Sequence, residues 1–221
     1  MELFEDQAPT KKPASKSSSS PLAERVRPQT LDEFVGQESL LGKDKPLRIL
    51  IEGDVVPSII LWGPPGCGKT TLARIISNHT GSDFHQLNAV SSGVQDVRKI
   101  IERAEVSHTR LKKRTILFID EIHRFNKAQQ DALLHSVEDG IITLIGATTE
   151  NPSFEVISPL LSRCRVYVLE PLGSHDLNHI VDRALKTDSF LKQKKIVMGE
   201  SERELLMLLA AGDARRSEER R

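Results

Sequence analysis

The chain has few cysteines, no excess of either charge and no long apolar run, and each absence excludes a class of protein. Only two of its 221 residues are cysteine, Cys67 and Cys164. Both lie inside motif-like segments, which argues against a structural disulfide and for a reducing compartment. Basic and acidic residues both total 31, so the formal net charge is zero, and no overall field points to nucleic acid or membranes. No apolar run approaches the roughly 20 residues that span a bilayer, and the acidic start is unlike a secretory signal. We expect a soluble, intracellular protein.

What the sequence does contain is a regular alternation of apolar strands and amphipathic helices. The predicted strands cover residues 58–62, 83–88, 115–119, 141–148 and 165–169. A helix is predicted over 46–52, another is capped by Asn126 and ends at Glu138, and a short one covers 159–162. This alternation predicts an α/β fold, a three-layer sandwich on a five-stranded parallel sheet, with the ligand outside the carboxyl ends of the strands.

The composition divides the chain into three segments. Residues 1–20 carry a serine tract and few apolar side chains, so we expect a disordered N-terminal arm. Residues 21–171 hold the α/β domain. Residues 172–221 show helical patterns only and end in a charged run, which predicts a partial helical lid.

The strongest motif is a phosphate-binding loop between the first strand and the helix that follows it. It matches a glycine, four free positions and then Gly-Lys-Thr. Gly66 and Gly68 let backbone N–H groups turn toward phosphate oxygens, and the following helix adds the positive end of its dipole. Lys69 would reach the outer phosphates and Thr70 would ligate Mg²⁺. The residues assigned to the nucleotide here are Gly63, Pro64, Pro65, Gly66, Cys67, Gly68, Lys69, Thr70 and Thr71.

Two carboxylates end the third predicted strand, at the edge where this loop should lie. Asp120 would hold Mg²⁺ through its water shell, because that ion prefers oxygen ligands and keeps several waters. Glu121 would polarise the attacking water. An Asp-Glu pair after a strand is also a common helix cap, but the upstream loop favours a catalytic pair.

Four other residues near the ends of predicted strands each have two interpretations. Asn88 could hydrogen-bond Glu121, or form an Asx turn. Thr148 and Thr149 could sense the γ-phosphate, or reflect strand propensity. Arg163 could form a surface ion pair, or enter a neighbouring subunit's site as an arginine finger, an effect worth about 10³ to 10⁵ in rate.

Other polar residues receive a structural interpretation. His123 and Arg124 follow Glu121 directly and could face substrate or a neighbouring subunit, but we prefer to interpret them as solvated loop residues. The basic cluster of Arg110, Lys112, Lys113 and Arg114 could contact a phosphate backbone, but a solvated helix end is the preferred interpretation.

With these residues placed, the chain resembles an AAA+ ATPase of the clamp-loader clade, and within it the replication-associated recombination protein A family, which includes the Werner-helicase-interacting ATPases. The match runs from about Pro21 to Arg216. Its most specific stretches are residues 60–66, 118–127 and 146–154, which read ILWGPPG, FIDEIHRFNK and GATTENPSF.

The resemblance implies roles for further residues. It makes the nucleotide ATP, held on the adenine side by the segment from Arg27 to Gln37, which includes Val35 and Gly36. It makes Asn88 the polar switch residue, Thr149 the first sensor and Arg163 the finger acting in trans. It also makes Arg215 a second sensor that reaches the γ-phosphate from the lid.

The implied function is a DNA-stimulated ATPase of stalled or gapped replication forks. It would use ATP and Mg²⁺ and act on single-stranded or forked DNA. The implied assembly is a homotetramer, and single-strand binding protein or replisome components are further expected partners. The implied location is the cytoplasm and nucleoid of a bacterium or the nucleus of a eukaryote.

Family members continue past the second sensor, so we expect the lid to be C-terminally truncated. The alternatives are a clamp-loader subunit, a Holliday-junction branch-migration motor, or an ATP-binding regulatory module with little turnover.

Overall fold

The computed structural model describes residues 20–194, 196 and 198–215. The expected N-terminal arm lies outside the described residues except for Ser20, and so does the charged run after Arg215.

The centre of the molecule is a five-stranded sheet in the order β2-β3-β4-β1-β5, with every neighbouring pair parallel. The strands are β1 (Ile59–Trp62), β2 (Asp83–Asn88), β3 (Thr115–Asp120), β4 (Ile142–Thr148) and β5 (Arg165–Val168). The predicted fold class is confirmed. Strand ends differ from the prediction by at most one residue, as at β4, which begins at Ile142 rather than Ile141.

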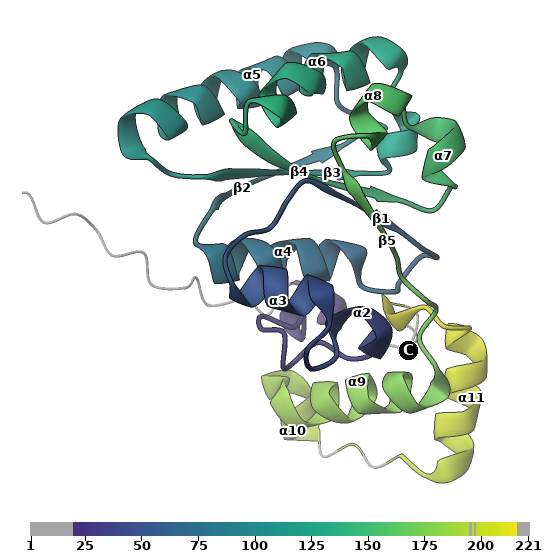
Figure 1. Ribbon diagram of the computed structural model, residues 1–221. Coiled ribbons are helices and arrows are strands. Elements are labelled where there is room, and N and C mark those ends of the chain that lie inside the picture. Colours follow the sequence, from purple (N-terminus) through teal and green to yellow (C-terminus); the bar gives the residue numbers. More distant parts are fainter. Residues whose placement is uncertain (1–19, 195, 197, 216–221) are drawn as a thin grey trace, which may run out of the picture.

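Helices cover both faces of this sheet, which gives the three layers seen in Figure 1. One face carries α5 (Val94–Val106), α6 (Lys127–Glu138), α7 (Pro152–Glu155) and α8 (Ser158–Leu161). The other face carries α3 (Pro46–Glu52) and α4 (Lys69–Thr80). Short irregular helices follow α5, as the π-helix η1 (Ser107–Leu111), and β3, as the 3₁₀ helix η2 (Ile122–Arg124).

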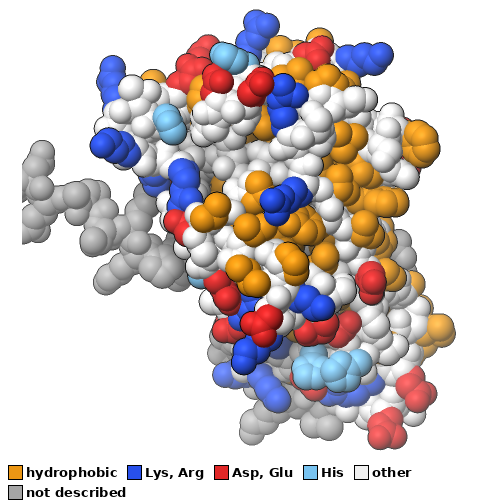
Figure 2. All heavy atoms as spheres, in the orientation of Figure 1, with side chains coloured by type: hydrophobic (Ala, Val, Ile, Leu, Met, Phe, Trp, Pro, Cys, Tyr) orange, Lys and Arg blue, Asp and Glu red, His pale blue; other side chains and the backbone are white. Residues whose placement is uncertain are grey.

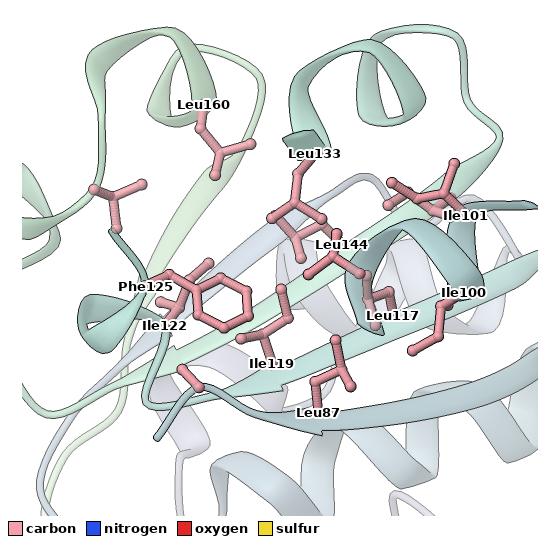
Figure 3. Close-up of a cluster of buried hydrophobic side chains, with 14 of the residues drawn as sticks. Leu87, Ile100, Ile101, Leu117, Ile119, Ile122, Phe125, Leu133, Leu144 and Leu160 are labelled. Atoms are coloured by element: carbon pink, nitrogen blue, oxygen red, sulfur yellow. The ribbon is translucent and has the colours of Figure 1, made fainter. Parts of the chain in front are cut away.

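The sheet forms because its central strands are apolar on both faces. Every residue of β3 from Thr115 to Ile119 is buried, as expected for a parallel strand covered by helices on both sides. Figure 3 shows the cluster on the α5 and α6 side, in which Leu117, Ile119, Leu133 and Leu144 meet. The carboxyl ends of β1, β3 and β4 are thereby fixed relative to one another.

A smaller group of helices packs beside the α3 and α4 face. It comprises α9 (Ser174–Thr187), α10 (Ser189–Lys194) and α11 (Glu200–Ala210), around the buried Leu172, Leu177 and Ala210. The N-terminal elements α1 (Leu22–Arg25) and α2 (Glu38–Leu41) lie between these lid helices and the sheet. Arg25 bridges to Asp188 at 2.7 Å, and Arg183 to Glu33 at 2.9 Å.

Apolar side chains gather on the side of the molecule that carries α7 and the edge strand β5 (Figure 2). Phe154, Val166 and Val168 are 84%, 40% and 50% exposed. Among the described residues, no helix combines the length and apolarity needed to cross a bilayer.

Candidate nucleotide-binding site

A cavity of about 310 Å³ opens at the carboxyl ends of the strands, as the fold class predicts. Five separate segments meet in it: the N-terminal elements, the phosphate loop, the ends of β3 and β4, and the lid. Its lining includes the predicted site residues Val35, Pro65, Gly66, Cys67, Gly68, Lys69, Thr70, Thr71, Asp120, Glu121, Thr149 and Arg215. Gly36, Gly63, Pro64, Asn88 and Arg163 do not line it.

The phosphate loop requires glycine at two positions for both conformation and space. Gly66 and Gly68 have φ angles of +73° and +102°, which L side chains rarely adopt. A Cβ on Gly66 would lie 2.0 Å from Asp213 Oδ1, and one on Gly68 would lie 2.6 Å from the Phe34 ring. The loop is therefore packed between the lid on one side and the N-terminal segment on the other.

Lys69 begins α4 and is held inside the loop. Its Nζ donates to the carbonyls of Gly63 at 2.7 Å and Pro64 at 2.8 Å. The adjacent Cys67 thiol is buried, and burial raises its pKa, although the nearby Lys69 and Arg215 cations act in the opposite direction. Gly63 and Pro64 thus contribute backbone acceptors that place the ammonium group, while Cys67 is a neutral packing residue.

Asp120 and Glu121 have different backbone conformations at the end of β3. Asp120 is the last strand residue, and Glu121 has a left-handed backbone with a φ of +56°. Such a φ is uncommon for a residue with a side chain and marks strain of order 1–3 kcal/mol that the surrounding structure must hold. The kink lets both carboxylates line the same cavity.

The prediction that His123 is a solvated loop residue was wrong, whereas Arg124 is exposed as expected. The His123 side chain is only 9% exposed, and its Nδ1 lies 3.2 Å from Glu121 Oε2 and 3.0 Å from Thr148 Oγ1. The neighbouring Ile122 and Phe125 are buried and hold η2 against the core (Figure 3). Their apolar character was the sequence signal that could have placed His123 inside.

The two threonines at the end of β4 have different surroundings. Thr148 is fully buried, and its hydroxyl accepts from the Glu150 N–H at 3.0 Å. Thr149 lines the cavity. Asn88 lies opposite Asp120 in the sheet register, but its Oδ1 accepts from the Val90 N–H at 2.9 Å. This contact is an Asx turn, the second of the two interpretations predicted for Asn88.

Arg163 lies outside the cavity, between α8 and β5. Its side chain donates to the Pro159 carbonyl at 2.8 Å and pairs with Glu138 at 3.1 Å. The surface ion pair is thus formed, and a role for this residue at a phosphate would require the site of another copy of the chain.

The side of the cavity opposite the strands is formed by the lid and the N-terminal segment. Arg215 lines it, and its backbone N–H donates to Asp213 Oδ1 at 2.9 Å, close to Gly66. Arg27 donates to Thr71 Oγ1 at 2.9 Å and so ties the segment to α4. Gly36 is structural, since a Cβ there would lie 2.7 Å from Leu172 Cδ2.

Several lining residues on this side were not predicted. They include Glu24, Ile180 and Arg183, whereas Arg27 and Phe34 fall within the predicted adenine-side segment, residues 27–37. Their positions depend on contacts between segments about 150 residues apart, such as Arg183 with Glu33, which no local pattern reports.

The predicted magnesium ligands suit that ion. Thr70 and Asp120 both line the cavity and offer a hydroxyl and a carboxylate, the hard oxygen donors that Mg²⁺ uses beside phosphates and water. Among the described residues, no group of three or more His, Cys, Asp or Glu side chains could hold a metal by itself. The donor set therefore fits an ion shared with a nucleotide.

The four cations of the basic cluster after α5 are exposed. Lys113 pairs with Asp83, and Arg114 pairs with Asp54. Both cysteines are free.

Comparison with known proteins finds relatives that match most of this chain. The chain is 49% identical to replication-associated recombination protein A of Escherichia coli strain K12, over 92% of this chain and 45% of that one. It is 48% identical to the ATPase WRNIP1 of Dictyostelium discoideum, over 90% of this chain and 23% of that one. It thus spans less than half of these relatives' length.

Solved structures agree with the fold. A RuvB variant of Thermotoga maritima superposes with a TM-score of 0.70 and 32% identity, over 87% of this chain and 62% of that one. The model of the ATPase family associated with various cellular activities (AAA) matches residues 59–172. With its phosphate loop, strand-end carboxylates and lid in the places described above, the chain belongs to the AAA family.

Proposed function

We propose that the chain is an ATPase that hydrolyses ATP to ADP and phosphate and acts on DNA at replication forks. The observation that carries the proposal is the single cavity in which the phosphate loop, Asp120, Glu121, Thr149 and Arg215 meet. The name of one relative, replication-associated recombination protein A, supplies the replication context, and the name of another, the ATPase WRNIP1, supplies the reaction.

The residues divide the chemistry between them. The loop N–H groups and Lys69 would bind the phosphates, and Thr149 and Arg215 would contact the γ-phosphate from opposite sides of the cavity. Glu121 would accept a proton from water as the water oxygen bonds to the γ-phosphorus and the bond from that phosphorus to the bridging oxygen of ADP breaks. Mg²⁺ held by Thr70 and Asp120 would neutralise charge on the phosphate oxygens.

Assembly into a homo-oligomer is part of the proposal, because Arg163 does not reach the chain's own cavity. It lies next to β5, at the side where Phe154, Val166 and Val168 are exposed. A second copy seated there would cover this apolar surface and bring Arg163 toward its own site as a finger in trans.

ATP turnover tests the proposal directly. Hydrolysis by the wild type should exceed that of Glu121→Gln by at least about 100-fold, and forked DNA should raise it. Lys69→Ala should lose nucleotide binding, whereas Glu121→Gln should keep it. Equal turnover by wild type and Glu121→Gln at every protein concentration would leave an ATP-binding regulatory module.

The trans role of Arg163 has its own control. Mixing an inactive Lys69→Ala chain with an inactive Arg163→Ala chain should restore part of the activity, because the first can donate a finger to the intact site of the second. Absence of recovery in the mixed oligomer would exclude the trans role.

A second candidate is a branch-migration motor. It is favoured by the structural similarity to a RuvB Holliday junction branch migration motor of Thermotoga maritima, with a TM-score of 0.65 and 31% identity. Movement of a four-way DNA junction driven by ATP would support this candidate, and turnover stimulated only by forks would support the first.

A further inference from the structure

His123 lies between Glu121 and Thr148, and the chemistry proposed above gives it no role. Its Nδ1 is 3.0 Å from Thr148 Oγ1 and 3.2 Å from Glu121 Oε2. The ring therefore connects the carboxylate assigned to the attacking water with the last residue of β4, which immediately precedes Thr149.

One oxygen of the Glu121 carboxylate lacks a hydrogen-bond donor. Glu121 Oε2 is buried and forms no hydrogen bond within the described residues, so Nδ1 lies at contact distance without completing one. Leaving a buried carboxylate oxygen without a donor is costly. If Nδ1 carries a proton, a small rotation of either side chain would let that one N–H be shared between Thr148 Oγ1 and Glu121 Oε2 as a three-centre hydrogen bond.

The contacts of Thr148 indicate that Nδ1 of His123 carries a proton. The Thr148 hydroxyl is 3.2 Å from the Glu150 carbonyl, to which it donates, and it accepts from the Glu150 N–H at 3.0 Å. A hydroxyl has one proton to donate, so it faces Nδ1 as an acceptor. A lone pair on Nδ1 would also face the lone pairs of Oε2. Both neighbours therefore favour the Nδ1–H tautomer.

The ring is held in place by its own helix. Ile122, the first residue of η2, and Phe125, the residue just after it, are 0% and 3% exposed in the cluster of Figure 3. Glu121, by contrast, lines the cavity and its side chain is 35% exposed although Oε2 is buried. Anchoring Oε2 leaves Oε1 as the oxygen that can receive the proton of water.

We propose that His123 is a positioning residue, whose Nδ1–H holds Glu121 Oε2 against the end of β4 and aims Oε1 at the attacking water. This inference rests on the proposed ATPase function. It assigns no proton transfer to His123, and nucleotide binding does not depend on it. Because general-base catalysis contributes about 10²- to 10⁴-fold and requires the base within hydrogen-bond reach, losing the anchor removes part of that factor.

Two substitutions at His123 separate positioning from packing. The side-chain amide of His123→Asn can place an N–H where Nδ1 lies, whereas that of His123→Gln lies nearer the position of Nε2. His123→Gln should lower kcat for ATP hydrolysis about 10- to 100-fold with an unchanged KM, and His123→Asn should stay within about threefold of the wild type. Equal losses of kcat in both variants would overturn the proposal. So would a smaller loss in His123→Gln, whose side chain is larger than that of Asn, because packing would then explain the effect.

The effect of a His123 substitution should depend on Glu121, and this dependence gives a sharper control. In a Glu121→Gln background, His123→Gln should cause no further loss of kcat, because both changes disable the same base. Independent, multiplying losses would show that His123 acts elsewhere.

A measurement without turnover keeps this inference separate from the proposed function. Side-chain ¹⁵N NMR, with the His123 signals assigned by their absence in His123→Asn, should report a proton on Nδ1. A proton on Nε2 alone would overturn the positioning role. Failure of the ATPase proposal would instead appear as equal turnover by wild type and Glu121→Gln.

Discussion

The two sides of the cavity are held in place by different forces. The phosphate side is built on β1, β3 and β4, whose residues Leu61, Ile119 and Ala147 are completely buried. On the other side, the lid has a small core of its own and is joined to the N-terminal segment through ion pairs such as Arg25 with Asp188 and Arg183 with Glu33.

This difference indicates which side can move. Displacing a strand of the sheet would open a close-packed core, whereas displacing the lid would break a few polar contacts that water can replace. We therefore expect the phosphate side to be rigid and the lid to adjust its position when a nucleotide binds.

The largest expected effect is in the sheet. Phe118 is completely buried in β3, and Phe118→Ala should lower the free energy of unfolding by about 3–5 kcal/mol, because it leaves a cavity that the sheet cannot close. Denaturant unfolding measures the loss. Val168→Ala, at a half-exposed position in β5, is the control and should change stability by less than about 0.5 kcal/mol. Similar losses in both variants would contradict a rigid central sheet.

The next effect concerns the lid. The Asp188 side chain is 3% exposed and accepts two hydrogen bonds from Arg25, at 2.7 and 3.2 Å. Asp188→Asn should weaken lid attachment by about 1.5–3 kcal/mol, the usual worth of a hydrogen bond to a charged group. Hydrogen exchange should become faster in α9, α10 and α11 and stay unchanged in β3 and β4.

A matched control lies on the same lid. Asp182 pairs with Arg203 at 2.6 Å, but its side chain is 46% exposed, so Asp182→Asn should leave exchange in α9 nearly unchanged. Faster exchange in the sheet of the Asp188 variant would mean that the lid and the sheet form one cooperative unit.

Sequence patterns predicted the rigid side well because its elements are defined locally. The apolar run of β3 and the helix from Pro46 to Glu52 have the predicted positions, and Asn126 caps α6 by accepting from the Gln129 N–H. Gly-Lys-Thr and Asp-Glu are contiguous signals, so most residues assigned from them line the cavity. The strand order depends on pairing between distant segments and was not predicted.

The other side of the cavity was predicted mainly through the family resemblance, which gave Val35 and Arg215. Ile180 and Arg183 line the cavity because α9 folds back on the N-terminal segment, and a helical stripe does not report its partner. The burial of His123 was missed for a related reason, since it depends on the left-handed backbone of Glu121 and on Thr148 from another strand.

In the wild type, acid should weaken the attachment of the lid in the same way as Asp188→Asn does. The hydrogen bond from Arg25 holds the pKa of Asp188 below its ordinary value. The pair therefore stabilises the lid fully above the unfolded value of about 3.9, and this contribution is lost as pH falls through the lower folded pKa. Protection factors of α9 should differ between wild type and Asp188→Asn at pH 5–8 and converge well below pH 4. A difference that persists at the lowest pH would assign the effect to packing.

The smallest expected effect is at the exposed pair between Arg183 and Glu33. Their side chains are 23% and 42% exposed, and the contact is 2.9 Å. A double-mutant cycle with Arg183→Ala and Glu33→Ala should give a coupling of about 0.2–1 kcal/mol in lid attachment, because water and salt screen such a pair. Arg183 lines the cavity, so the same cycle should be repeated with bound ATP. A coupling that grows with nucleotide would show that the lid closes on its ligand through this pair, whereas an unchanged coupling would leave the Arg25 bridge as the main attachment of the lid.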